Sequence, residues 1–225
     1  MFRNERLGVI IPQQEHARMA GHVALHWGNE NFDKPKIGVE ALVKGLTLHH
    51  MGYGPNDTLD FTSLNDEELL KVYENDTQVS LGDTDAELVN LFHHLRLVRN
   101  RNEKTPTEAF LDLQKEIETT IETKLTQSKF TKADFDWTNK ITHLCDRIAF
   151  NFSMGKMKEP SIGICSRVGS NDAVAVVHDV DVETITLHPW PFSVKSFKGF
   201  VIAYESKDYP HSLSPVLMEY EVKQE

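Results

Sequence analysis

The sequence predicts an α+β protein, mainly α-helical, with a helical bundle over residues 1–158 and a small antiparallel β-sheet over residues 159–225. Between residues 13 and 154, apolar residues recur at spacings of three and four, the pattern of helices that bury one face. From residue 160 onward, short β-prone runs alternate with Gly, Asn, Asp and Pro, as strands and turns do. We expect this sheet to pack on one side of the bundle, joined by an N-terminal strand at residues 7–11.

The composition is that of a globular protein without a nucleic-acid or membrane partner. The 225 residues are 40% hydrophobic, which is enough for one substantial core, and the net charge of -10 argues against a nucleic-acid partner. No apolar run approaches the roughly 20 residues of a membrane helix, so we expect no membrane partner. The first residues lack a signal-peptide pattern, and Cys145 and Cys165 make no disulfide framework, so we expect a cytoplasmic protein.

The first predicted helix begins near Gln13 and carries a histidine on its buried side. At 100° per residue, His16 falls within the same arc as Met19, Ala20 and Val23. A lone histidine at such a position is more often a hydrogen-bonded core residue than a metal ligand.

The second predicted helix ends in two adjacent histidines. Apolar residues between positions 39 and 46 form its buried face, His49 and His50 continue that face, and the glycine-rich turn at residues 52–54 should stop the helix. Histidines at the inner end of a helix often build metal sites in bundles. The alternative is one hydrogen-bonded core histidine beside one exposed histidine.

An acidic stretch separates this turn from the next long helix. Residues 56–87 contain ten Asp or Glu and one Lys, without the spacing of an EF-hand. We expect a solvated surface of loops and short helices that lies away from any metal site, rather than a cation-binding segment.

Two further helices are predicted at residues 84–99 and 107–127, and only the first contains candidate ligands. His94 borders its apolar face beside Val98, whereas His93 points nearly opposite. We therefore expect His94 to face the core and His93 to lie away from the site, with His93 kept as the alternative ligand. The helix at residues 107–127 carries a stripe of packing residues only.

The last long helix should begin at Asp134 or Asp136, and it carries an aspartate in apolar surroundings. Asp146 lies among apolar residues on this helix. A buried carboxylate needs a cation or several donors, so either an arginine across the core or a metal ion would satisfy it. In the predicted sheet, His178 closes a strand and should lie away from the site.

Five residues from four core segments therefore form a candidate metal site: His16, His49, His50, His94 and Asp146. Imidazole nitrogens with one carboxylate suit Fe, Mn, Zn or Ni better than Ca or Mg, so we expect one of these as a divalent cofactor.

The order of these residues resembles the HD-domain phosphohydrolase superfamily. More closely, the chain resembles an uncharacterised, mostly bacterial family that is distantly similar to HD domains. The matching pieces are QQEHARMAGHVALHW, LTLHHMGYG, ELVNLFHHLRLV, LCDRIAFNF and LHPWPF, which lie between residues 13 and 192. The resemblance implies an HD-like helical core, a metal-dependent hydrolase of the phosphohydrolase type, and His16, His49, His94 and Asp146 as ligands.

One residue departs from the superfamily pattern. His50 stands where HD domains have the aspartate of their HD pair. A histidine cannot bridge two metal ions as a carboxylate does, so this departure argues against a two-ion site, and the number of ions stays open. His50 is kept as a ligand or as a catalytic acid–base group.

Three hypotheses about function remain at this point. The first is a metal-dependent hydrolase with a small-molecule, phosphorylated substrate. The second is an HD-like metal-dependent oxygenase, and the third is a degenerate, non-catalytic HD-like binding protein. The substrate, the metal and the oligomeric state, including a homo-oligomer, stay open.

Overall fold

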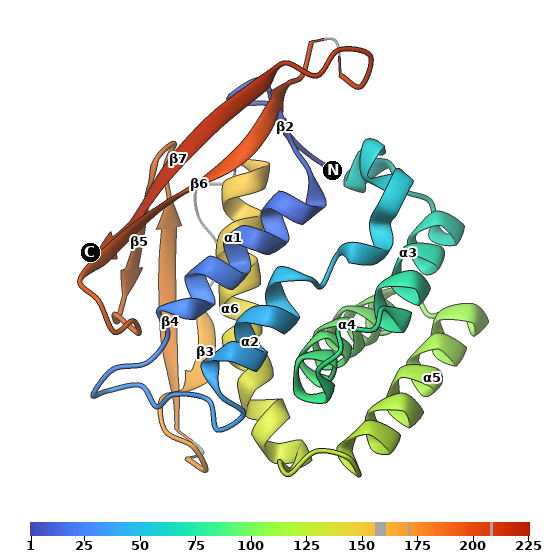
Figure 1. The fold of residues 1–225 in the computed structure, drawn as a ribbon, viewed down its shortest axis with the longest axis vertical. Helices are drawn as coiled ribbons and strands as arrows, with labels where there is room; N and C mark the ends of the chain where they lie inside the picture. Colours follow the sequence, from blue (N-terminus) through green and yellow to red (C-terminus); the bar gives the residue numbers. More distant parts are fainter. Residues whose placement is uncertain (156–160, 171, 208) are drawn as a thin grey trace.

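The computed structural model describes residues 1–155, 161–170, 172–207 and 209–225, and these residues form six α-helices gathered on one side of a seven-stranded sheet (Figure 1). The predicted boundary at residue 158 lies outside the described residues. Within the described part, one continuous hydrophobic core runs from the sheet into the helices.

The helices follow one another along the chain as α1 (Gln13–Leu25), α2 (Val39–Thr47), α3 (Asp66–Gln78), α4 (Thr84–Lys104), α5 (Glu108–Leu125) and α6 (Lys132–Met154). Two 3₁₀ helices, Met51–Thr58 and Phe61–Ser63, connect α2 to α3. No described helix has both the length and the apolar composition needed to cross a membrane.

Two helix ends differ from the prediction. α2 ends at Thr47, so His49 and His50 lie in the turn after the helix instead of on its buried face. α6 begins at Lys132 because Thr131 and Asp134 cap each other's backbone N–H groups, so Asp134 belongs to the first turn and does not precede it.

The predicted fold class, an HD-like helical bundle with a small antiparallel sheet, is wrong. The seven strands form one mixed sheet in the order β1-β2-β6-β7-β5-β4-β3, and β5 and β7 run parallel. The strands are β1 (Phe2–Asn4), β2 (Val9–Ile11), β3 (Ile162–Cys165), β4 (Ala173–Val180), β5 (Thr184–His188), β6 (Ser196–Glu205) and β7 (Pro215–Gln224).

Both ends of the chain enter the sheet, and the sheet is larger than predicted because it also includes β1. The C-terminal strand β7 pairs with β6 on one side and β5 on the other, in the middle of the sheet. At the other end of the chain, β2 pairs with β6, which places part of residues 7–11 in the sheet, and the three-residue β1 extends the edge. A strand as short as β1 has no readable alternation in the sequence.

α1 and α6 pack directly on the sheet and carry the other helices away from it (Figure 1). Tyr220 of β7 is buried on this side, where its hydroxyl lies 2.6 Å from Nδ1 of His22 on α1. α2 contacts both α1 and α4, and at Gly45 it approaches α4 so closely that a Cβ atom would lie 2.7 Å from the carbonyl oxygen of Ala86. These contacts bring the ends of α1 and α2 beside α4 and α6.

Glu87, in the first turn of α4, stabilises the loop that precedes this helix. It is buried, it accepts hydrogen bonds from the backbone N–H groups of Leu81 and Gly82, and it pairs with Lys124 of α5. Burial alone raises the pKa of Glu87, but the bonds from Lys124 and Leu81 outweigh it and hold the pKa below the usual 4.5.

Glu87→Gln should therefore lower the free energy of unfolding by about 1–3 kcal/mol at pH 7, the usual cost of disturbing a buried hydrogen-bonded charge. Because the folded pKa is lowered, the contribution of the carboxylate is present above pH 4.5 and is lost as the pH falls through the folded pKa. Urea unfolding at pH 7 measures the loss of stability, and urea unfolding in acid measures whether the loss disappears when the carboxylate is protonated. Glu103→Gln, at an exposed site on α4, is the matched control. An equal loss of stability at both pH values would contradict this account.

Candidate metal centre

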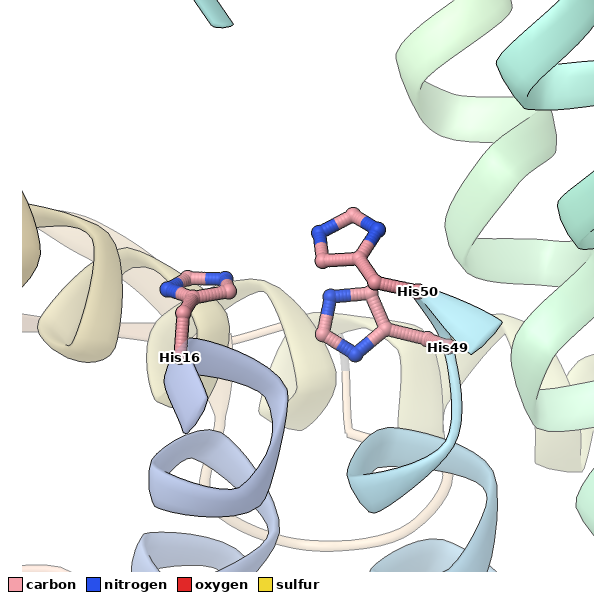
Figure 2. Close-up of side chains that lie close together, drawn as sticks. All are labelled: His16, His49 and His50. Atoms are coloured by element: carbon pink, nitrogen blue, oxygen red, sulfur yellow. The ribbon is translucent and has the colours of Figure 1, made fainter. Parts of the chain in front are cut away.

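The structure brings the five predicted ligands together from four helical segments. His16 lies in the first turns of α1, His49 and His50 follow α2, His94 lies on α4, and Asp146 lies on α6. Figure 2 shows the rings of His16, His49 and His50 side by side at the neighbouring ends of α1 and α2. None of the four histidines is more than 6% exposed.

The first group of candidate ligands surrounds Asp146. Oδ1 of Asp146 lies 3.1 Å from Nε2 of His16 and 3.5 Å from Nε2 of His49. The two imidazole rings are 5.6 Å apart, and the ring of Phe2 on the N-terminal strand lies 4.8 Å from His16. The N-terminal strand thus helps to bury this group.

The hydrogen bond made by His49 determines which of its nitrogens can bind a metal. Nδ1 of His49 donates to the carbonyl oxygen of Leu46, so in the neutral ring Nε2 carries the lone pair. This Nε2 faces Oδ1 of Asp146, and an ionised carboxylate also only accepts hydrogen bonds. Two acceptors that face each other in a buried place cost free energy unless a cation lies between them.

The second group of candidate ligands surrounds Asp76, a residue of α3. Oδ2 of Asp76 lies 3.5 Å from Nδ1 of His50 and 3.4 Å from Nε2 of His94. All three side chains are buried. His50 also lies next to the first group, with its ring 3.9 Å from that of His49. The predicted single set of five ligands is therefore divided between two adjacent carboxylates.

Two residues that were expected to lie away from the site belong to it. The acidic stretch contributes Asp76, because α3 turns this carboxylate inward beside the buried Val72 and Tyr73. His93 is 1% exposed, and one of its ring nitrogens lies within 4.8 Å of a nitrogen of His49 and an oxygen of Asp146. The expectation for His93 was wrong because α4 is buried on most sides in this region, so no surface is left for the ring.

Hydrogen bonds distinguish His93 from His94. Nη2 of Arg96 lies 2.9 Å from Nδ1 of His93 and can only donate, so a neutral His93 carries its proton on Nε2. His94 has the opposite arrangement, because its Nδ1 lies 3.0 Å from the carbonyl oxygen of Asn90 and its Nε2 keeps the lone pair. His94 is therefore in the form that binds metal through Nε2, whereas His93 acts as a donor.

Burial favours the neutral form of the imidazoles. Desolvation lowers the pKa of His49, lowers that of His93 well below its ordinary value, and lowers that of His50 to about 3. Neutral imidazole is the form that coordinates metal ions.

The two carboxylates remain ionised despite their burial. Burial alone raises the pKa of Asp146, but the nearby His93 and the contacts with the first group's histidines bring it well below the usual value. The same holds for Asp76: burial raises its pKa, but its contacts with His50 and His94 outweigh burial and lower the pKa below the usual value. The site therefore combines ionised carboxylates with neutral imidazoles, the donor set of a divalent d-block ion.

His178 belongs to none of the candidate ligand groups in the described part of the chain. It lies within β4 instead of closing a strand, because Leu187 of β5 pairs with it. Its Nε2 accepts a hydrogen bond from the amide of Asn151, at 2.8 Å.

Comparison with known proteins places the chain in a family. A family model with the description "Protein of unknown function (DUF3891)" matches residues 2–205. No curated protein and no solved structure matches the chain. The expectation of an uncharacterised family is thus confirmed, whereas none of these comparisons links the chain to HD-domain proteins.

Proposed function

Because the chain belongs to the DUF3891 family, whose description assigns no function, we propose one from the site alone: a metal-dependent hydrolase that acts on a small phosphorylated molecule. His16, His49 and Asp146 hold the metal ion in this proposal. The observation that carries it is the buried lone pair of His49 Nε2, which faces the ionised Asp146 at 3.5 Å and has no hydrogen-bond donor among the described residues.

The distances around Asp146 suit a shared ion. Ligand atoms about 2.0–2.1 Å from a tetrahedral ion lie about 3.3–3.4 Å from one another. The separations of 3.1 and 3.5 Å from Asp146 Oδ1 to the two imidazole nitrogens bracket this value. When bound, a divalent cation supplies Lewis acidity, which polarises a phosphoryl oxygen and makes a water molecule more acidic.

Arg96 supports the choice of a phosphorylated substrate. Its Nη2 lies 3.6 Å from Oδ2 of Asp146, on the opposite oxygen from the histidines. The side chains of Arg96 and Asp146 are 15% and 16% exposed, more than the histidines, so a substrate would approach from their side. A guanidinium beside Asp146 matches the geometry of phosphate oxygens.

The predicted acid–base role of His50 stays a prediction. Because burial lowers the pKa of His50 to about 3, its ring is neutral at pH 7. In that form the ring can bind a cation, whereas a pKa so far from 7 makes it both a weak proton acceptor and a weak proton donor.

Activity should depend on both the metal ion and Arg96. Protein purified without a histidine tag and stripped with a chelator should not hydrolyse p-nitrophenyl phosphate or bis(p-nitrophenyl) phosphate, and reloading with Mn²⁺, Fe²⁺, Zn²⁺ or Ni²⁺ should restore hydrolysis of one of them. Arg96→Gln should lower kcat about 100-fold, the usual loss for one charge-stabilising donor.

Arg99→Gln is the matched control, because Arg99 lies one turn further along α4 and pairs with Glu118 on the surface. It should leave kcat unchanged. Absence of hydrolysis with every metal ion would overturn the phosphohydrolase proposal, and oxygen uptake by the iron-loaded protein would favour the oxygenase instead.

A further inference from the structure

We propose that His50, Asp76 and His94 form a second divalent-cation site beside the first, so that this centre takes two ions. The inference deepens the proposed function and rests on it, because both ions would act on one phosphorylated substrate. The missing aspartate of the HD pair argued against two ions at this centre. Asp76, from a different helix, supplies the second carboxylate.

The ligand atoms of the second group have the separations that one shared ion requires. Oδ2 of Asp76 lies 3.4 Å from Nε2 of His94 and 3.5 Å from Nδ1 of His50. Both values are close to the 3.3–3.4 Å of about tetrahedral ligands on zinc or a similar metal. They are long for hydrogen bonds between a nitrogen and a carboxylate, which favour about 2.7–2.9 Å when charged.

An unsatisfied lone pair points to a cation independently of these distances. Nδ1 of His94 donates to the carbonyl oxygen of Asn90, so Nε2 has no proton in the neutral ring. This Nε2 is buried and has no hydrogen-bond partner among the described residues. Its nearest charged neighbour is Oδ2 of Asp76, another acceptor, and a cation between the two atoms satisfies both.

The surroundings of Asp76 leave one oxygen available for an ion. The backbone N–H of Gly52 donates to Oδ1 at 2.6 Å, and the side-chain amide of Asn90 donates to the backbone carbonyl of Asp76 at 2.8 Å. In metal sites, hydrogen bonds from residues that do not themselves contact the metal orient the ligands in this way. Oδ2 is thereby directed toward His50 and His94.

The two groups are adjacent through the histidine pair. His49 belongs to the first group and His50 to the second, and their rings are 3.9 Å apart. Nitrogen and oxygen donors at both places suit Mn, Fe, Zn or Ni. Paired ions in hydrolytic sites stabilise both the attacking and the leaving oxygen of a phosphoryl group, so the expected substrate class is a phosphate ester.

Metal stoichiometry tests the second site separately from activity. Untagged, chelator-stripped protein is dialysed against Mn²⁺ or Zn²⁺, and bound metal is counted per folded chain. The wild type should bind two ions. Asp76→Asn should bind one, and His94→Asn should also bind one, which decides the question if Asp76→Asn does not fold by circular dichroism. His26→Asn, at the far end of α1, is the control and should bind two.

The outcomes separate this inference from the proposed function. Asp146→Asn should lose the first ion and keep the second. A wild type that binds one ion, with Asp76→Asn also binding one, would overturn the second site and leave the first intact. Two ions in Asp146→Asn would overturn the proposed function while the second site stands.

Discussion

Asp146→Asn is expected to lower the affinity of the first site for divalent metal by at least about 100-fold. Removing a residue that only hydrogen-bonds to a metal ligand already lowers metal affinity about 10- to 100-fold, and Asp146 is the only carboxylate in contact with both His16 and His49 among the described residues. An amide in its place is neutral, so it also removes the charge that balances the cation. Isothermal titration of stripped protein with Zn²⁺ measures the loss.

The apoprotein should also be less stable after the same substitution. Without metal, the Asp146 carboxylate lies 3.1 Å from Nε2 of His16 and 3.6 Å from Nη2 of Arg96, and its pKa is held well below the usual value, so its charge stabilises the folded state. Asp146→Asn should therefore melt lower than the wild type after chelation, and added metal should stabilise the wild type more than the variant, which keeps only the second site. Equal metal affinity in the two proteins would refute the ligand role of Asp146.

Gly52→Ala is expected to lower the free energy of unfolding by about 1–3 kcal/mol, the usual cost of overpacking, and to weaken the second metal site. A Cβ atom on Gly52 would lie 2.3 Å from the backbone nitrogen of Asp76 and 2.5 Å from the carbonyl carbon of Asn75. Backbone atoms of a helix cannot turn aside as a side chain can, so α3 must move away from the turn. The displacement carries Asp76 away from His50.

Gly163→Ala is the matched control, since its Cβ would meet Ala173 at an ordinary 3.6 Å. Urea unfolding and metal counting on both variants check the prediction. Gly52→Ala should lose stability and the second ion, whereas Gly163→Ala should lose neither. Full stability and two ions in Gly52→Ala would contradict the close packing of α3 on this turn.

The long helices could be predicted from the sequence because each has an apolar stripe and capping residues. Asp83, for example, accepts hydrogen bonds from the backbone N–H groups of Asp85 and Ala86 at the start of α4. The sheet could not be predicted in the same way. The parallel pairing of β5 with the C-terminal β7 depends on contacts between distant segments, which alternation within one strand does not reveal.

Only part of the site could be predicted, because the sequence shows which helical faces are apolar but not which polar residues meet between helices. His16 and Asp146 stood out because each lies on an apolar helical face, and the structure brings them within 3.1 Å of each other. Asp76 was hidden among many surface acids. Its signal was local: it follows Val72 by four residues, on the buried face of a short amphipathic helix. His93 was misjudged because a single helical wheel assumes one buried face, whereas α4 is covered on several sides.

Metal analysis of the native protein is the decisive test of whether buried histidines and two aspartates of this chain bind divalent d-block ions. The chain should be produced without a histidine tag, purified without chelator, and analysed by inductively coupled plasma mass spectrometry. We expect at least one Mn, Fe, Zn or Ni ion per chain, rising to two after dialysis against excess metal. A folded protein that contains none of these metals, and takes up none on dialysis, would contradict it.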